Sequence, residues 1–277
     1  MNDVSTVFVK LYESEVSNAY QQEGSLFQSL VRNKSVTNAA KVQFPWLGKM
    51  DAVTKSGTGK IPTAKVEHKP VEIELVDYYA ASTIDEADLD KINYDERQQY
   101  AKLGGFALGR KTDEVVVKAM TSGQTVDSGS ADASFNLDLI RGIISKFNKA
   151  DVPDDRQRFC AVGADQWEYL MKQDAFVRSD YVGADYPLLK NKENRLWRGI
   201  VWFQTNMLAK PSAATTTCLL FHKTAVGCAN GKKVSSKIEY RIDYDDYFVM
   251  NKMAIGAKVI DADGVVKFTV KDAIATD

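Results

Sequence analysis

Only two histidines, His68 and His222, are available for general acid–base chemistry in this chain of 277 residues. A Ser-His-Asp or Cys-His site needs one of them beside a recognisable nucleophile. Neither has a nucleophile motif nearby, and no G-x-S-x-G elbow occurs. We therefore predict that His68 is an exposed hairpin residue. His222, in the apolar run LLFHKTAV, is predicted to be a satisfied core or strand-end residue.

The glycine-rich segments do not match a phosphate-binding loop. SGTGK at 56–60 is not followed by Ser or Thr, and NGKK at 230–233 lacks the P-loop spacing. Gly104, Gly105 and Gly109 lie inside a predicted helix rather than after a strand, so they cannot form a dinucleotide fingerprint. They are predicted to allow another backbone to approach closely or the helix to bend slightly. We expect no cofactor.

Metal and redox chemistry are equally poorly supported. Two acidic clusters lack the calcium-loop spacing and are predicted to be solvated faces: Asp85, Glu86, Asp88 and Asp90, then Asp243, Asp245 and Asp246. Cys160, Cys218 and Cys228 are widely spaced among apolar residues, which predicts buried free thiols. We predict no metal site, no catalytic residue and hence no enzyme.

Composition is that of an ordinary soluble protein. Hydrophobic residues make up 44% and charged residues 26%, and 36 basic against 37 acidic residues give a net charge of -1. A general nucleic-acid or membrane binder would favour a basic surplus or patch. No apolar run reaches the roughly 18 residues that span a bilayer, and no signal-peptide core is present near the N-terminus. We expect an intracellular origin and no membrane partner.

One long helix over residues 94–120 is the most informative predicted element. Asp95 and Gln98 fit a capping box at its start. Apolar and long side chains recur at three- and four-residue steps and predict one buried stripe, with Tyr100, Leu103, Ala107 and Val115 as its core. The remaining faces are largely charged, so this helix is expected to pack on one layer and to present its back to solvent or to a neighbouring subunit.

A lysine-rich hairpin precedes that helix. Val42, Phe44 and Trp46 alternate in the outgoing strand, whose Pro45 predicts an edge position, and Val71 and Ile73 alternate in the return. The long polar tip carries Lys49, Lys55, Lys60 and Lys65. A two-stranded hairpin is not stable alone in water. It must therefore lie either on its own domain or on the next subunit of an assembly.

The other elements follow from periodicity and turn residues. Residues 7–32 have a helical pattern broken at Gly24, and 122–134 are small and polar like an exposed loop. Between 135 and 230 we predict a compact α/β subdomain with helices at 135–149 and 164–172 and strands at 159–163, 200–204 and 218–228. Strands are also predicted at 238–242 and on both sides of the turn at 261–264.

Several motifs in this order carry a resemblance to a known family. They are FPWLGKMDA at 44–52, VEIELVDYYAASTIDEADL at 71–89, YDERQQYAKLGGFALGRKTDE at 94–114, RGIVWFQTNMLAK at 198–210 and FHKTAVGCA at 221–229. The chain resembles the major capsid proteins of tailed bacteriophages, particularly those of short-tailed (podovirus-type) phages. The resemblance implies an α+β Hong Kong 97-type fold. Its parts would be an N-terminal arm at 1–40, an extended-loop hairpin at 41–84, a peripheral domain at 85–132 and 241–277 with a long spine helix, and an axial domain at 133–240.

The same resemblance implies a function. Copies would assemble into hexamers and pentamers of an icosahedral head that encloses double-stranded DNA without sequence-specific binding, built in the host cytoplasm and ending in the virion. No long coiled-coil segment precedes the arm, so a separate scaffolding protein is expected, with a portal protein as a further partner and a decoration protein as an optional one. Some relatives cross-link a loop lysine, but no motif here predicts that for Lys49, Lys55 or Lys60.

Two alternatives stay open at this point. One is an encapsulin-like nanocompartment shell of the same fold, which would enclose protein cargo. The other is an uncharacterised α/β enzyme or binding domain with its site in the 135–230 subdomain.

Overall fold

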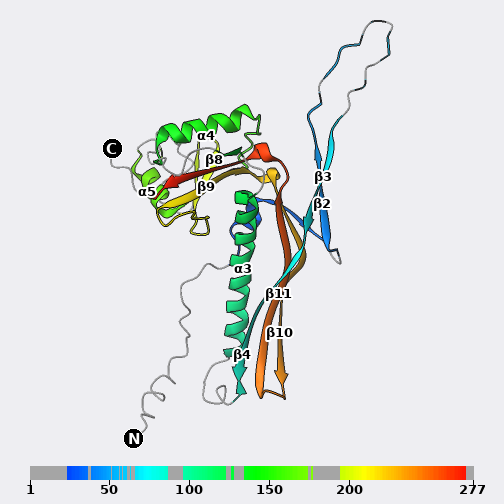
Figure 1. The fold of residues 1–277 in the computed structure, drawn as a ribbon, viewed down its shortest axis with the longest axis vertical. Coiled ribbons are helices and arrows are strands. Elements are labelled where there is room, and N and C mark those ends of the chain that lie inside the picture. Colours follow the sequence, from blue (N-terminus) through cyan, green and yellow to red (C-terminus); the bar gives the residue numbers. More distant parts are fainter. Residues whose placement is uncertain are drawn as a thin grey trace.

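The computed structural model describes residues 24–36, 39–50, 52–55, 57, 59–60, 63, 66–86, 96–122, 126–127, 134–173, 176 and 194–272. The chain forms an elongated molecule with a four-stranded sheet, a six-stranded sheet and a projecting two-stranded hairpin (Figure 1). One continuous hydrophobic core joins the two larger sheets.

The four-stranded sheet has the order β1-β10-β11-β4 and supports the long helix α3 (Glu96–Ser122), which lies alongside it (Figure 1). Its strands are β1 (Arg32–Ser35), β10 (Val226–Arg241), β11 (Asp246–Val259) and β4 (Val76–Asp85). Alternate residues of β11, including Val249, Asn251 and Met253, are buried on one face of the sheet. This period of two is the pattern of a sheet covered on one side.

The six-stranded sheet has the order β5-β12-β9-β6-β8-β7 and carries the shorter helices. Its elements are β5 (Val126–Asp127), β12 (Val265–Lys271), β9 (Thr215–His222), β6 (Arg158–Val162), β8 (Ile200–Gln204) and β7 (Asn194–Trp197), with α4 (Leu137–Lys149) and α5 (Ala164–Lys172). Asn136 caps α4 by accepting a hydrogen bond from the backbone nitrogen of Leu139. Every residue of β9 is buried.

The hairpin consists of β2 (Lys41–Leu47) and β3 (His68–Glu74), paired antiparallel with Pro45 opposite Pro70. It projects away from both larger sheets (Figure 1). The predicted hairpin is therefore confirmed. Pro45 does lie on an edge strand, because a two-stranded sheet has only edges.

The domain boundaries at 84, 132 and 240 stay a prediction, and the sheets join strands from both sides of each of them. β4 leaves the hairpin and joins the sheet under α3, and β10 joins it as well, although 226–240 had been grouped with the axial domain. β12 lies in the sheet of α4 and α5, although 241–277 had been grouped with the spine helix. The strands on both sides of 261–264 therefore do not form a hairpin, since β11 and β12 belong to different sheets.

Two further predictions need correction. The strand predicted at 218–228 is two strands, because the 3-10 turn η3 (Lys223–Ala225) separates β9 from β10. Within the described residues 24–32 of the predicted helical pattern at 7–32, the structure forms the short 3-10 turn η2 (Phe27–Leu30) before β1 begins. Residues 7–23 lie outside the described part of the chain, as does Asp95 of the predicted capping box.

Candidate assembly surfaces

Helix α3 contacts the sheet closely at Gly104, where the absence of a side chain leaves room for a residue of β11. The buried Asn251 of β11 donates a hydrogen bond from Nδ2 to the backbone oxygen of Ala101 at 3.1 Å and accepts one from the Ser236 hydroxyl. A Cβ atom at Gly104 would collide with the Asn251 amide. The group that approaches Gly104 is therefore a side chain and not the predicted backbone, and Gly105 faces open space.

A second fixation joins α3 to the N-terminal segment. Asp113 is fully buried and accepts hydrogen bonds from the backbone nitrogens of Leu26 and Phe27, both at 3.0 Å, and from the Ser25 hydroxyl. Negative charge at the start of a helical turn is favourable because the first amides have no partner inside the turn. Gly109, one turn earlier on α3, lets the backbone of Gly24 approach; its oxygen would lie 2.6 Å from an added Cβ.

The side of α3 that is buried differs from the predicted stripe. Tyr100, Leu103, Ala107 and Val115 are only half-buried in the subunit. The buried side chains are Leu108, Thr112, Asp113, Val116, Val117 and Met120. The predicted stripe did not include Thr112 and Asp113, which are buried because hydrogen bonds satisfy them. The sequence analysis missed the burial of Asp113. The available signal was its position one helical turn after Gly109, on the same face of the helix.

The base of the hairpin has its own small core. Val42, Phe44 and Ile73 pack against Ala229 of β10 and are at most 3% exposed. The side chains of Arg32 and Lys34 lie over the Phe44 ring. A cleft of about 660 Å³ adjoins this base and is lined by Trp46, Lys69, Glu72 and the β11–β12 connection at 258–263. The base is therefore held by its own subunit.

Beyond the base, the hairpin exposes both cations and apolar side chains. Leu47, Met50 and Val53 are 60%, 66% and 58% exposed. Lys55 and Lys60 are exposed at the tip, and Lys65 lies outside the described residues. These positions form no contact surface within the described subunit, so the structure alone does not bring the predicted lysines together.

Lys49 differs from the other hairpin lysines. Its Nζ atom lies 2.9 Å from the Oδ2 atom of Asp151, which comes directly after α4 and its C-cap residue. This hydrogen bond raises the pKa of Lys49 above its ordinary value. Both side chains are largely exposed, so the pair orients the hairpin more than it stabilises the subunit.

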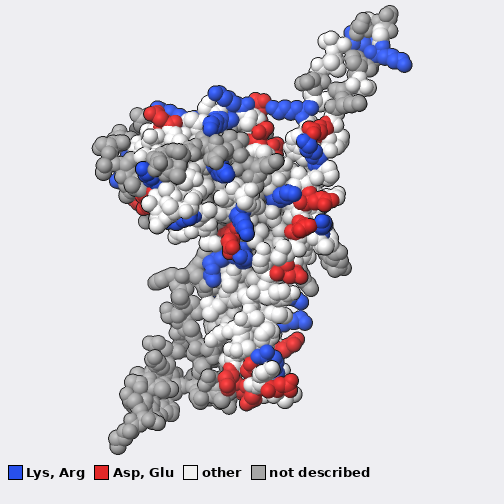
Figure 2. Space-filling view, in the orientation of Figure 1, with Lys and Arg blue, Asp and Glu red and all other residues white. Residues whose placement is uncertain are grey.

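The far end of the four-stranded sheet is acidic. Figure 2 shows acidic side chains gathered at the end opposite the hairpin tip. Arg241 binds Asp246 through two hydrogen bonds, of 2.8 and 2.5 Å, and Tyr240 donates one to Asp245 at 2.5 Å. The hydrogen bond to Asp245 raises the pKa of Tyr240. Ile242 and Tyr244 are exposed beside these pairs, so this end combines charge with unpartnered apolar surface.

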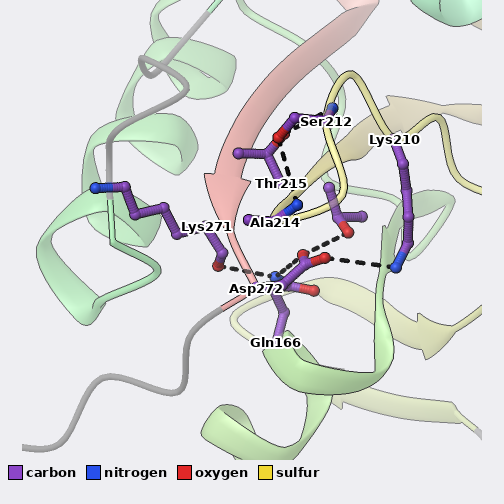
Figure 3. Close-up of polar contacts among 8 residues, drawn as sticks. Gln166, Lys210, Ser212, Ala214, Thr215, Lys271 and Asp272 are labelled. Carbon is purple, nitrogen blue, oxygen red and sulfur yellow. Dashed lines mark hydrogen bonds and ion pairs between the residues drawn. The ribbon is translucent and has the colours of Figure 1, made fainter.

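A polar network ties the end of β12 to α5. Asp272 accepts hydrogen bonds from Thr216 at 2.6 Å and Gln166 at 3.3 Å and lies 3.4 Å from the Lys210 ammonium (Figure 3). Burial opposes ionisation of Asp272, but these partners hold its pKa below the ordinary value. Gln166 also donates to the backbone oxygen of Lys271. The network positions the last strand and contains no nucleophile–base pair.

The remaining candidate groups for chemistry have structural roles. His222 is buried at the end of β9, with Nδ1 2.8 Å from the Thr224 hydroxyl and Nε2 3.0 Å from Asp155, which confirms the strand-end prediction. His68 is exposed at the start of β3, as predicted. All three cysteines are free and buried, and burial raises the thiol pKa of Cys218 and of Cys228 to about 12.

Two properties of the described residues concern metal ions and membranes. No group of three or more His, Cys, Asp or Glu side chains there could hold a metal ion. No helix in the described part of the chain is both long and apolar enough to cross a membrane.

Comparison with known proteins gives the family. A family model described as phage capsid protein matches residues 4–272, so the chain belongs to the phage capsid protein family. Its fold is that of several solved heads, matched at low sequence identity. The capsid of cyanophage P-SCSP1u has a TM-score of 0.72 at 18% identity, with 96% of this chain and 94% of that chain covered. The head of Helicobacter pylori bacteriophage KHP40 has a TM-score of 0.73 at 12% identity, with 94% and 93% covered.

A third similar structure is the capsid of Ralstonia phage GP4, with a TM-score of 0.72 at 13% identity, covering 96% of this chain and 95% of that chain. No curated protein matches. The chain is thus a structural major capsid protein of a tailed phage, with the Hong Kong 97-type fold, and it forms the icosahedral head of the virion. This family favours the phage head over the nanocompartment, enzyme and binding-domain alternatives.

Proposed function

We propose that copies of this subunit form hexamers and pentamers and that the β2–β3 hairpin of each copy lies across a neighbouring copy. The exposure of Leu47, Met50 and Val53 on a projecting two-stranded hairpin is the observation that carries the proposal. A hairpin of this kind has too little apolar surface to hold its conformation alone. A neighbour supplies the missing surface, and a head-to-tail contact of this kind closes into a ring when the rotation fits.

The hairpin lysines have different roles in this proposal. Lys49 is already paired with Asp151 of its own subunit, so it is not assigned to the contact with the neighbour. Lys55 and Lys60 are exposed at the tip and contact acidic groups of the neighbour, with Lys65 expected to join them. Covalent cross-linking of these lysines is not part of the proposal.

Half-buried residues of α3 complete the predicted contact surface. Tyr100, Leu103, Ala107 and Val115 retain accessible area in the isolated subunit, which an adjacent copy would cover. They are therefore proposed as contact residues between copies rather than as the internal core of the helix.

Other partners belong to the same proposal. A separate scaffolding protein and a portal protein would join the assembly in the host cytoplasm, with a decoration protein as an optional further partner. The net charge of -1 supports an enclosure of double-stranded DNA that does not depend on tight or sequence-specific binding.

Shortening the hairpin tests the proposal. Residues 49–66 are replaced by Asn-Gly, a two-residue turn suited to the Gly48–Glu67 pair that would then close the ladder. We expect an unchanged circular dichroism spectrum and urea midpoint, but no shells in negative-stain images, with or without a scaffolding protein. Lys49→Ala is the control for the lost ion pair and should still assemble. Normal shells from the shortened variant would contradict the intersubunit role.

A further inference from the structure

The outer edge of β10 is a free strand edge over much of its length in the described part of the molecule. β1 pairs with β10 only from Gly227 to Asn230, and the last backbone hydrogen bond on that side joins Val36 to Asn230. From Ser235 to Arg241, β10 keeps a regular register with β11 on its other side. No described strand pairs with the outer side of this stretch. Its outward N–H and C=O groups are therefore ready to pair with another strand.

The side chains along this edge divide between the two faces of the sheet. Ile238 is paired with Val249, which is buried on the α3 side, so Ser236, Ile238 and Tyr240 share that side. Lys237 and Glu239 occupy the opposite side. Ile238 and Tyr240 are nevertheless 43% and 41% exposed, so α3 leaves this part of the face open.

The edges of the hairpin contrast with this one. Pro45 and Pro70 lie opposite each other and remove a backbone donor from each hairpin edge. β10 contains no proline, and its irregular pairing with β11 is confined to residues 230–235. Proline and bulges are common devices that protect an edge from other strands. The edge at 235–241 has neither, and its charges Lys237 and Glu239 are of opposite sign.

We infer that two copies of this chain join their β10 edges as antiparallel strands around a two-fold axis, with Ile238 of one copy opposite Ile238 of the other. An antiparallel edge-to-edge pair places α3 of both copies on the same face of the joined sheet. Even-numbered residues of one copy then face even-numbered residues of the other, and odd-numbered residues face odd-numbered ones, as an isologous contact around a two-fold axis requires. In this register Lys237 of each copy faces Glu239 of the other, and Ser236 faces Tyr240.

Charge selects this register from its neighbours. A shift of the pairing by two residues in one direction places Lys237 opposite Lys237, and a shift in the other direction places Glu239 opposite Glu239. Like charges directly opposite each other are destabilising, and opposite charges are stabilising. The register centred on Ile238 also joins exposed apolar surface, because the two Ile238 side chains, each 43% exposed, face each other.

This contact differs in kind from the proposed hairpin contact. A hairpin that lies across its neighbour is a head-to-tail contact and builds rings, whereas a two-fold contact joins one ring to another. The inference rests on the assembly of copies into a shell, but it does not require the hairpin role. Its partner is a second copy of the chain because only this register makes the edge complementary to itself.

Site-specific cross-linking tests the inference. Ile238→Cys places two thiols opposite each other, since directly opposed Cβ atoms lie about 4.5–5.5 Å apart in antiparallel pairs. Oxidised shells of this variant should give a disulfide-linked dimer on non-reducing gels. Tyr79→Cys is the matched control: Tyr79 is 61% exposed on β4, at the opposite edge, and should give none. The native cysteines are buried and do not compete.

Charge reversal supplies a second, independent measurement. Lys237→Glu and Glu239→Lys each put two pairs of like charges across the contact and should raise the concentration at which shells form on the order of ten-fold. The double variant Lys237→Glu/Glu239→Lys restores opposite pairs and should assemble like the wild type. Equal defects in the double and single variants would overturn the inference.

The outcomes separate this inference from the proposed hairpin role. Shells that form normally with Ile238→Cys but yield no dimer would overturn the β10 contact and leave the hairpin proposal intact. A disulfide between Ile238→Cys and a cysteine placed at Leu47 would also overturn it, because the occupant of the edge would then be a neighbour's hairpin. Shells from the hairpin-shortened variant that still carry the dimer would support the β10 contact and contradict the hairpin role.

Discussion

The Oδ1 atom of Asp113 lies 3.0 Å from the backbone nitrogen of Phe27, although the two residues are 86 positions apart in the chain. Phe27 is itself fully buried and contacts the rings of Phe203 and Phe221. One carboxylate therefore joins the long helix to the N-terminal segment at the place where that segment enters the core.

Removal of this carboxylate should destabilise the subunit. Asp113→Ala removes the acceptor of the part-buried Leu26 N–H and of the buried Phe27 N–H, and each buried group left unsatisfied costs about 1–3 kcal/mol. We expect a loss of about 3 kcal/mol in urea unfolding of unassembled subunits. Glu114→Ala, at the exposed next position of the same helix, is the control and should change stability by less than about 0.5 kcal/mol. Similar values for both variants would contradict the anchoring role.

The glycines of α3 provide a matched pair of substitutions. Gly109→Ala forces a methyl group against the backbone of Gly24 and should destabilise the subunit by about 1–3 kcal/mol. Gly105→Ala meets open space and should stabilise it by about 0.5–1 kcal/mol, because Ala is the better helix former. Thermal unfolding of the two variants measures both effects. A stabilising Gly109→Ala would show that the Gly24 backbone moves away without cost.

Burial along α3 predicts different results at two apolar positions. Val116 is fully buried, so Val116→Asp places an unpaired carboxylate in the core and should abolish native circular dichroism. Leu103 is half-buried, so Leu103→Asp should leave the subunit folded while weakening assembly. Unfolding by Leu103→Asp would show that the sequence-based stripe, rather than the observed one, is the core of the helix.

Acid should weaken the contact between His222 and Asp155. The hydrogen bond from His222 lowers the pKa of Asp155 below its ordinary value of 3.8. A group whose pKa is lowered in the folded state stabilises that state above its unfolded pKa and loses the contribution as the pH falls through the folded pKa. The contribution is therefore complete above about pH 4 and lost below it. Asp155→Asn should lower stability at pH 6 more than at pH 3; a constant difference between these pH values would contradict the linkage.

Local periodicity predicted those helices and strands whose boundaries are determined by their own residues. The α5 and β8 boundaries match their predicted ranges, because capping positions, apolar spacing and β-branched residues coincide there. The division of 218–228 into two strands could not be predicted in this way. All residues from Cys218 to Val226 except Lys223 and Thr224 are buried, and two adjacent polar residues do not show by themselves that a strand ends there.

Pairing between distant strands was also beyond local reasoning. β4 pairs with β11 although the whole α/β region lies between them in the chain, and nothing in the local sequence of either strand identifies the other as its partner. The same limit explains the candidate surfaces. The exposed lysines of the hairpin could be predicted from composition, whereas the Lys49–Asp151 pair and the free edge of β10 depend on how distant segments meet.

The order of strands has a consequence for synthesis on the ribosome. β11 lies between β10 and β4, and β12 lies between β5 and β9, so in each large sheet the described strand that comes latest in the chain occupies an inner position. Neither sheet can close until residues 246–271 have left the exit tunnel. A nascent chain therefore lacks the strand that joins β10 to β4 until β11 has emerged, and premature joining of unfinished subunits is disfavoured by the order of the strands in the chain.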